Sequence, residues 1–301
     1  MPRQVIVLLA TFNGAPWLDE QLASIFAQED ASVSVSVLAS DDGSTDATGE
    51  VLQRWARDTG RVRVLPNAGQ RLGACGNFLR LLREAELGET DAVALADQDD
   101  IWLPGRLDTA LRRLASGDTD GFSSDAIAFW PDGKRKPLGK AHAQRRFDHL
   151  FEPAGPGCTY VIGRRLALAL QHEINVDPER FVGIGYHDWL IYAYARSNGY
   201  RWFIDPTPSL LYRQHAHNEL GANFGTTGVT RRWERLRNGW FRHQVLRIAS
   251  FWPAGQEDVI ERLQRFGWAD RIWLALRSNH LRRRPRDWLA LSAMLLLNVL
   301  R

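Results

Sequence analysis

Three carboxylates in one tetrapeptide give the strongest chemical signal in this sequence. Asp97-Gln98-Asp99-Asp100 follows the apolar run 92–96, whose composition is typical of a buried parallel strand. At the C-terminal end of a central strand, these side chains would lie where open α/β sheets form their ligand crevice. Like charges this close repel unless a cation lies among them, and oxygen ligands suit Mg²⁺ or Mn²⁺. The tetrapeptide therefore predicts a divalent-metal site, against the alternative of an acidic turn that only caps the next helix.

A second acidic turn follows an earlier strand. Residues 33–39 alternate between apolar and small side chains, as in a strand, and Asp41 and Asp42 follow almost directly. Ser44 or Thr45 would cap the helix expected next. Because both carboxylates precede that helix, a capping role does not account for them.

The first expected strand, residues 5–10, also ends in a polar turn, which contains Thr11 and Asn13. The C-terminal ends of parallel strands meet at one edge of a sheet, so this turn and the two acidic turns should converge there. Their convergence predicts a binding site.

The elements that must position these residues alternate along the first part of the chain. Strands are expected near 5–10, 33–39, 61–65 and 92–96, with helices near 16–28, 45–58, 75–86 and 105–116. This order predicts an α/β fold with a parallel sheet and right-handed crossovers. Further strands are expected near 158–163, 201–204 and 209–213, with helices near 164–172 and 188–198.

Length and composition fit a cytoplasmic enzyme. A chain of 301 residues can bury a full α/β core and carry a smaller appendage. The N-terminal apolar run is a strand of about six residues, too short for a signal peptide. Cys75 and Cys158 fit no metal spacing and are expected to be free thiols.

The C-terminal region differs in charge from the rest. Residues 231–301 contain 15 Arg, no Lys, 6 acidic residues and 6 of the 12 Trp. Arg and Trp at helical spacings predict a surface that contacts an anionic membrane, while no nucleic-acid-binding module is present. The apolar run 288–300 is too short to span a bilayer, so the alternatives are a helix packed on the body or a homodimer contact.

Three motifs together resemble glycosyltransferase family 2. Ala10-Thr11-Phe12-Asn13, Asp41-Asp42-Gly43-Ser44-Thr45-Asp46 and Asp97-Gln98-Asp99-Asp100-Ile101-Trp102 occur in the family's order. The resemblance implies a GT-A fold, with a Rossmann-like, mostly parallel sheet flanked by helices. It divides the chain into a catalytic domain, 1–224, and an Arg/Trp-rich helical C-terminal region, 225–301. Within the domain, 1–118 would bind the nucleotide-sugar and 119–224 the acceptor.

The resemblance also assigns roles to residues of the donor and metal sites. Asp99 would be the first metal ligand, with Asp97 on the ribose or the metal, Asp100 as the runner-up, and His215 as a further ligand. His217 shares the extended face of His215 and stays open as an alternative. The residues expected to bind the nucleotide-sugar are Thr11, Asn13, Asp41, Asp42, Arg71, Asp97 and Arg213.

The catalytic base expected from the resemblance is Asp188, with an N-cap as its alternative role. His187 is a second candidate. The Gln-x-x-Arg-Trp motif of processive relatives is absent, because neither Arg231 nor Arg232 has Gln three positions before it, and this predicts single additions.

The resemblance implies an inverting, metal-dependent transferase in bacterial surface glycan synthesis, and the Arg/Trp-rich C-terminal region predicts that it lies at the inner face of the cell membrane. The segment 97–102 and Tyr212-Arg213-Gln214-His215 resemble the rhamnosyltransferase-like branch, which implies dTDP-rhamnose as donor and a lipid-linked or polysaccharide acceptor. A UDP-hexose donor is the alternative within the fold. Two other classes remain: a non-catalytic membrane adaptor, and a nucleotidyltransferase, which should carry a Lys/Arg-bearing glycine-rich loop where this chain has 11–14.

Overall fold

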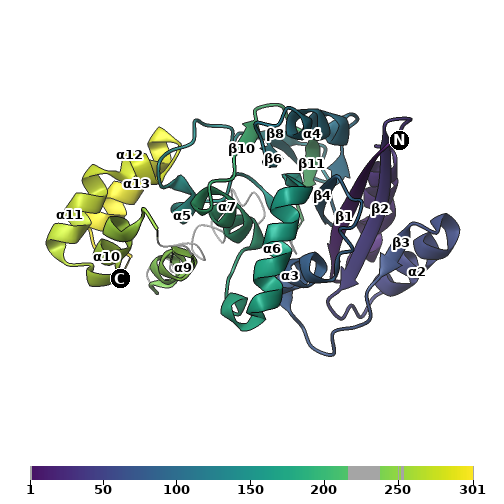
Figure 1. The fold of residues 1–301 in the computed structure, drawn as a ribbon, viewed down its shortest axis with the longest axis horizontal. Helices are drawn as coiled ribbons and strands as arrows, with labels where there is room; N and C mark the ends of the chain where they lie inside the picture. The colour runs from purple at the N-terminus through teal and green to yellow at the C-terminus, as the bar shows by residue number, and fades with distance from the viewer. Residues whose placement is uncertain (1, 216–237, 250, 252–253, 301) are drawn as a thin grey trace. The chain divides into compact units, whose positions relative to one another are not determined.

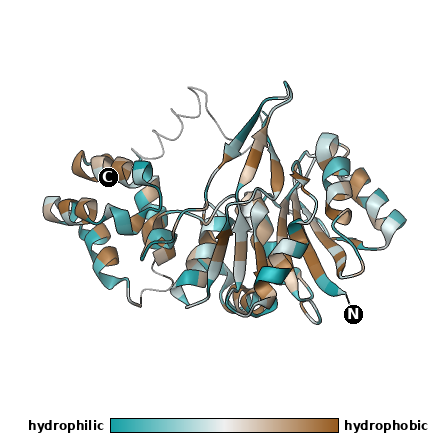
Figure 2. Cartoon of the chain, turned by 90° about the horizontal axis from the view of Figure 1, so that it is seen from above, coloured by the Kyte–Doolittle hydropathy of each residue, from teal (hydrophilic) through white to brown (hydrophobic). Residues whose placement is uncertain are grey.

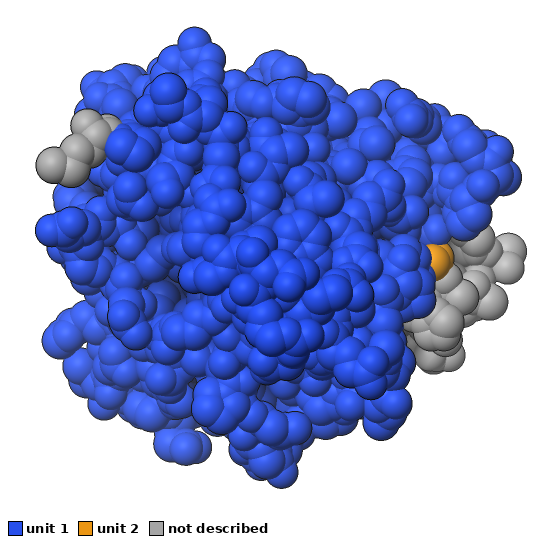
Figure 3. Space-filling model, turned by 90° about the vertical axis from the view of Figure 1, so that its right-hand side faces the viewer, with its two compact units in different colours: residues 1–141, 155–188, 200–214 blue, residues 142–154, 189–199, 215–301 orange. Residues whose placement is uncertain are grey.

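The computed structural model describes residues 2–215, 238–249, 251 and 254–300. These form two compact units, and Figure 3 shows one face of unit 1 in blue, with little of unit 2 in view. Unit 1 comprises residues 1–141, 155–188 and 200–214, and unit 2 comprises 142–154, 189–199 and 215–301. The predicted boundary between residues 224 and 225 lies outside the described residues and stays a prediction.

A seven-stranded sheet forms the centre of unit 1 (Figure 1). Its strand order is β10-β6-β9-β4-β1-β2-β3, and only β9 among these strands runs antiparallel to its neighbours. The strands are β1 (Arg3–Thr11), β2 (Val33–Asp41), β3 (Val62–Val64), β4 (Ala92–Asp97), β6 (Gly121–Ser124), β9 (Val161–Gly163) and β10 (Trp202–Asp205). The predicted mostly parallel sheet is therefore confirmed.

The register of the central strands fixes where the site forms. Ala10 pairs with Asp97 and Thr11 pairs with Asp41, so β1, β2 and β4 end at the same edge. The five residues of β4 before Asp97 are fully buried, because helices cover both faces of a parallel sheet. The polar side chains at the strand ends are thus held by a rigid apolar core.

A second sheet in unit 1 has the order β5-β11-β7-β8. Its strands are β5 (Ile101–Trp102), β7 (Ala126–Phe129), β8 (Arg135–Leu138) and β11 (Leu210–Arg213). Antiparallel pairing of β5 with β11 brings residues 99–102 beside 210–213, although they are far apart in the sequence. The sequence reasoning missed β5, because a two-residue strand has no periodicity to detect.

Helices pack on the main sheet of unit 1. They are α1 (Ala15–Phe26), α2 (Thr48–Thr59), α3 (Gly73–Glu84), α4 (Arg106–Ala115), α6 (Arg164–Val176) and the short 3₁₀ turns η1 (Gly157–Thr159) and η2 (Pro178–Phe181). The expectation that Ser44 or Thr45 caps α2 was wrong, since α2 begins only at Thr48. The Ser44 hydroxyl bonds instead to Asp41 and the Thr45 hydroxyl to Asn13, so these residues belong to the turn before the helix.

Unit 2 is helical. It contains α5 (Asp148–Phe151), all of α7 (His187–Ser197) after Asp188, α9 (Trp240–Ala249), α10 (Glu257–Arg265), α11 (Trp268–Leu276), α12 (Ser278–Leu281) and α13 (Pro285–Leu296). The apolar run at the end of the chain forms α13, which packs on α11 and α12. Among the described residues, no helix has the length and hydropathy needed to cross a bilayer.

Candidate active site

Thr11 and Asp41 are joined at the ends of neighbouring strands. The Thr11 hydroxyl donates to Asp41 Oδ1 at 2.9 Å, and the Ser44 backbone N–H donates to Asp41 Oδ2 at 2.8 Å. Because the Ser44 hydroxyl also donates to Asp41 Oδ1, this carboxylate supports the turn after β2. The predicted pair is thus brought together.

Asn13 links the same two turns. Its φ of 49° is in the left-handed region, which Asn tolerates better than most residues. In this conformation its backbone N–H donates to Ser44 Oγ at 2.8 Å, and its Oδ1 accepts from the Thr45 N–H at 2.8 Å.

Asp42 binds the loop that follows β3. Its carboxylate is only 5% exposed and accepts from the backbone N–H groups of Leu72 at 2.6 Å and Gly73 at 2.9 Å. Arg71 lies beside it, with Nε 3.8 Å from Asp42 Oδ2, and its guanidinium stacks 3.7 Å from the centre of the Phe12 ring. The structure therefore gathers Asp42, Arg71 and Phe12 into one polar and aromatic edge.

Gln98 holds the backbone of Phe12 by two hydrogen bonds. The Phe12 N–H donates to Gln98 Oε1 at 2.7 Å, and Gln98 Nε2 donates to the Phe12 carbonyl at 2.9 Å. A Cβ on Gly14 would lie 2.1 Å from Gln98 Oε1, so only glycine permits this approach. The sequence analysis missed this role, because an amide between two carboxylates gives no signal of its target.

Two of the three carboxylates after β4 form a close group with a cysteine. Among the described residues, one group of possible metal ligands has its ligand atoms within 4.8 Å of one another, namely Asp97, Asp100 and Cys158. Asp99 is buried, at 7% exposure, but is not a member of this group. The runner-up Asp100 thus belongs to this group with Asp97, the first choice Asp99 does not, and Cys158 was not expected here at all.

Burial and charge act together on Asp100. Its fractional exposure is 1%, and its desolvation, reinforced by the charges of Asp99 and Asp97, raises the pKa of its carboxyl well above the ordinary value. Its Oδ1 accepts from the Arg213 N–H at 3.3 Å, whereas Oδ2 has no hydrogen-bond partner among the described residues. Burial likewise raises the pKa of the Cys158 thiol, which keeps it protonated.

A buried cation lies beneath this group. Arg106 is 2% exposed, donates from Nη2 to the Cys158 carbonyl at 2.6 Å, and stacks 4.1 Å from the centre of the Trp102 ring. Desolvation lowers the pKa of Arg106 to about 10, so it stays charged and partly balances the carboxylates. Sequence alone gave no reason to separate this arginine from others on a helix.

Arg213 contacts the acidic segment from β11. Its Nε donates to the Asp99 carbonyl at 2.8 Å, and its Nη2 forms an ion pair with Glu20. The guanidinium lies 4.6 Å from the centre of the Phe129 ring. Arg213 therefore lies beside the acidic segment 97–100, which it contacts through the backbone carbonyl of Asp99.

Asp188 is the first acidic residue of α7, is 7% exposed and lies against η1. A Cβ on Gly157 would lie 3.1 Å from Asp188 Cβ and 2.4 Å from His187 Nε2. Cys158, the next residue of η1, belongs to the group with Asp97 and Asp100. This 3₁₀ turn therefore connects the predicted base with the carboxylate group.

His187 is unsuited to act as a base. Its ring stacks on Phe78 with centroids 3.9 Å apart, and burial lowers its pKa to about 3. Its Nε2 is buried without a hydrogen-bond partner among the described residues. A histidine that holds a proton this weakly and packs this tightly acts as a neutral core residue.

The sequence also predicts His215, or His217 in its place, as a metal ligand. His215 belongs to unit 2, and its role as a metal ligand stays a prediction. His217 lies outside the described residues.

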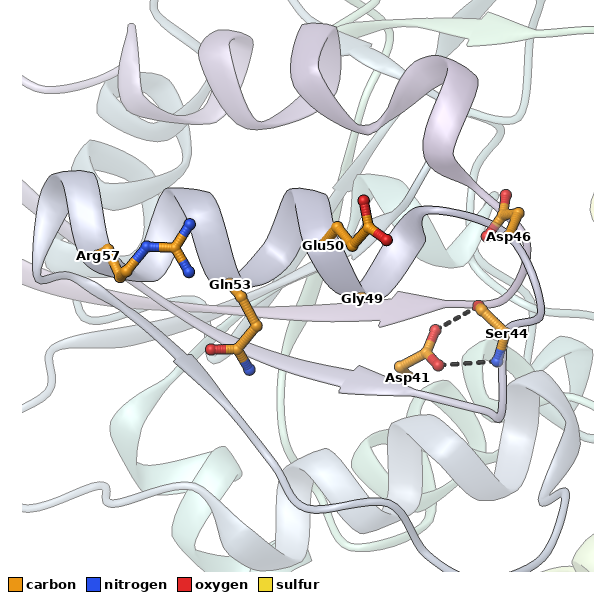
Figure 4. Close-up of a pocket in the computed structure, with 7 residues that line it drawn as sticks. All are labelled: Asp41, Ser44, Asp46, Gly49, Glu50, Gln53 and Arg57. Carbon is orange, nitrogen blue, oxygen red and sulfur yellow. Dashed lines mark hydrogen bonds between the residues drawn. The ribbon is translucent and has the colours of Figure 1, made fainter.

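A hollow of about 590 Å³ lies along α2, beside the turn after β2 (Figure 4). Its lining residues are Asp41, Ser44, Asp46, Gly49, Glu50, Gln53 and Arg57. It shares Asp41 and Ser44 with the strand-end site, but the remaining side chains come from α2 and the turn before it. The carboxylates that follow β4 do not line this hollow.

Comparisons with known proteins agree with this geometry. The family model described as glycosyl transferase family 2 matches residues 6–164. A "dTDP-rhamnosyl transferase RfbG" of Shigella flexneri is 35% identical over 292 residues, which cover 97% of this chain and 100% of that protein.

Two solved structures share the fold. The S. aureus TarS 1-349 complex with UDP-GlcNAc has a TM-score of 0.58 at 14% identity, covering 99% of this chain and 90% of the TarS 1-349 chain. The Pyrobaculum calidifontis mannosyltransferase PcManGT, in complex with GDP-Man and Mn2+, has a TM-score of 0.52 at 18% identity, covering 99% and 86%. The α/β fold is thus the predicted GT-A fold, and the chain belongs to glycosyl transferase family 2, as a glycosyltransferase similar to its rhamnosyltransferases.

Proposed function

We propose that this glycosyltransferase moves rhamnose from dTDP-rhamnose to a lipid-linked or polysaccharide acceptor, with inversion at the anomeric carbon. The observation that supports the proposal best is the position of η1, which contacts Asp188 through Gly157 and the carboxylate group through Cys158. Such a transfer needs a base beside the acceptor hydroxyl. It also needs carboxylates that can hold a cation at the diphosphate of the donor.

The donor nucleotide is proposed to lie along the edge formed by Thr11, Asn13, Asp41 and Asp42. Asp42 presents a carboxylate at which the imide N–H of thymine or uracil would donate, beside the Arg71 and Phe12 stack. The identity of the donor sugar rests on the similarity to the Shigella flexneri rhamnosyltransferase. A UDP-hexose is the alternative donor.

The diphosphate is proposed to lie at the carboxylates with a divalent cation, Mg²⁺ or Mn²⁺. Asp99, Asp97 and His215 are the proposed ligands, and the unpartnered Asp100 Oδ2 also fits a hard cation. The sulfur of Cys158 is a soft ligand and fits such a hard ion poorly. A cation bound there would stabilise the charge on the departing nucleotide diphosphate.

The chemical step is proposed to use Asp188. Its carboxylate accepts the proton of the acceptor hydroxyl, and the resulting nucleophilic oxygen forms the new bond to the anomeric carbon. The bond to the diphosphate oxygen breaks on the opposite side, which inverts the configuration. Arg213 and Arg106 add positive charge near the side on which the diphosphate leaves.

The experiment that tests this function is a donor panel with a defined product. Purified protein is incubated with dTDP-rhamnose, UDP-glucose and GDP-mannose and a lipid-linked acceptor in the presence of Mg²⁺, and the product anomer is assigned by NMR. We expect turnover with dTDP-rhamnose and inversion of the donor linkage. Turnover with UDP-glucose alone would select the alternative donor, and no transfer from any donor would contradict the proposal.

A further inference from the structure

Helix α11 exposes only apolar side chains among its described residues. Trp268, Ile272 and Leu276 are 72%, 37% and 76% exposed and follow one another at four-residue intervals. The only other exposed position of the helix is Ala269. A surface helix normally presents its polar face to water, so this helix has the reverse arrangement.

Helix α13, which packs on α11, also exposes apolar side chains, together with Arg286 near its start. Leu289 is 56% exposed, Leu296 is 55% exposed and Leu297, just after the helix, is 75% exposed. Figure 2 shows brown, hydrophobic stretches in these C-terminal helices. We call the six side chains the apolar face: Trp268, Ile272, Leu276, Leu289, Leu296 and Leu297.

The charged side chains exposed between residues 268 and 300 are Arg277 and Arg286, and Arg286 Nε lies 3.4 Å from Asp287 Oδ1. Helix α10, which packs on α11, exposes Glu257, Asp258 and Glu261. The Arg277 guanidinium stacks 4.1 Å from the centre of the Trp273 ring, which keeps it at the surface beside α11. An apolar surface bordered by arginine complements a layer of hydrocarbon beneath anionic headgroups.

We propose that the apolar face of α11 and α13 inserts into the surface of an anionic lipid bilayer. The inference deepens the proposed function, since it rests on a lipid-linked acceptor and names the surface that would contact the membrane. A second copy of the chain fits this surface less well. In a two-fold contact the same patch meets itself, which would bring Arg277 toward its own copy.

Vesicle binding of the full chain tests the inference without the need for turnover. The variant carries Trp268→Gln, Ile272→Gln and Leu276→Gln, which are exposed positions that keep a good helix former. Sedimentation with vesicles of phosphatidylglycerol and phosphatidylethanolamine should show binding of the wild type, weaker binding to phosphatidylcholine, and about a tenfold or greater loss in the variant. The matched control is Val176→Gln on α6, which removes a 69% exposed apolar side chain elsewhere and should bind as the wild type does.

Two results would overturn the inference. One is equal vesicle binding by the wild type and the triple variant. The other is a wild-type dimer in light scattering that the triple variant converts to monomers while neither binds vesicles, which would make the apolar face a contact between copies. If vesicle binding depends on the apolar face but no donor sugar is transferred, the inference stands and the proposed function fails.

Discussion

Arg283 and Asp148 form a buried ion pair, with Nη1 3.1 Å from Oδ2 and side-chain exposures of 2% and 0%. Arg196 Nη1 lies 3.3 Å from the other carboxylate oxygen, and the Tyr192 hydroxyl donates to Oδ2 at 3.0 Å. Arg283 also donates from its backbone N–H to Glu152 Oε1 at 2.6 Å. This arginine, counted in the sequence as cationic surface, therefore holds the C-terminal helices to the α5 segment of unit 2.

Replacing Arg283 with Met should destabilise the protein by about 3–5 kcal/mol, because it leaves Asp148 charged and partly unpaired in the interior. Urea denaturation followed by circular dichroism measures the change. Arg286→Met is the matched control, since that side chain is 80% exposed and its loss should change the free energy of unfolding little. Equal effects of the two substitutions would show that the buried pair does not stabilise unit 2.

Asp188→Asn should lower kcat by roughly 10²–10⁴-fold and leave the donor affinity nearly unchanged, because it removes a proton acceptor but keeps the shape. Steady-state kinetics with both substrates separate the two effects. The control is Asp177→Asn, an exposed carboxylate whose side chain caps η2. A variant within a few-fold of the wild type would exclude Asp188 as the base.

Asp99→Asn and Asp100→Asn distinguish the two candidate metal carboxylates. We expect Asp99→Asn to weaken Mn²⁺-dependent donor binding and turnover. We expect Asp100→Asn to lower the melting temperature more than it lowers the affinity for Mn²⁺, since Asp100 is the more deeply buried and bonds to β11. Calorimetric Mn²⁺ titration with dTDP present measures binding, and the melting temperature measures the fold. The reverse result would move the metal to Asp100, and turnover indifferent to chelator would contradict a metal mechanism.

The sheet could be predicted from the sequence because its central strands β1 and β4 contain continuous apolar runs. The run 92–96 can be buried only in the middle of a sheet, and its acidic end then marks the ligand edge. By contrast, β5 and the reversed direction of β9 depend on pairing with residues far along the chain, which no local pattern records.

The site was predictable only where it follows strand ends. Thr11, Asp41, Asp42 and Asp97 come directly after predicted strands, so their convergence follows from topology. Cys158 reaches the carboxylates from a 3₁₀ turn, and its single thiol matches no ligand spacing in the sequence. For such residues the tertiary fold, rather than the local sequence, decides the neighbours.

Two buried histidines should make stability depend on pH in the acidic range. Burial lowers the pKa of His187 to about 3 and that of His149 to about 4, from 6.5 in the unfolded chain. As the pH falls below 6.5 the unfolded chain takes up protons that the folded protein does not, so the free energy of unfolding decreases until about pH 4. Each histidine contributes a slope of up to about 1.4 kcal/mol per pH unit.

Urea denaturation between pH 7.5 and pH 4.5 measures how the free energy of unfolding changes with pH. His187→Asn should remove the contribution of one of the two histidines to this slope. Stability contributed by these two groups is fully present above pH 6.5. A free energy of unfolding that is flat from pH 6.5 to pH 4.5 would contradict the neutral, buried state of both rings.

Gln98→Ala should raise the donor KM by about tenfold, because it removes both hydrogen bonds that hold Phe12 beneath Arg71. The fold should persist, since Gln98 lies at the sheet edge and not in the apolar core. Steady-state kinetics with varied dTDP-rhamnose measure the effect. The control is Gln53→Ala, which lines the hollow along α2 and should leave the donor KM unchanged. A larger rise for Gln53→Ala than for Gln98→Ala would place the donor in that hollow instead of at the strand ends.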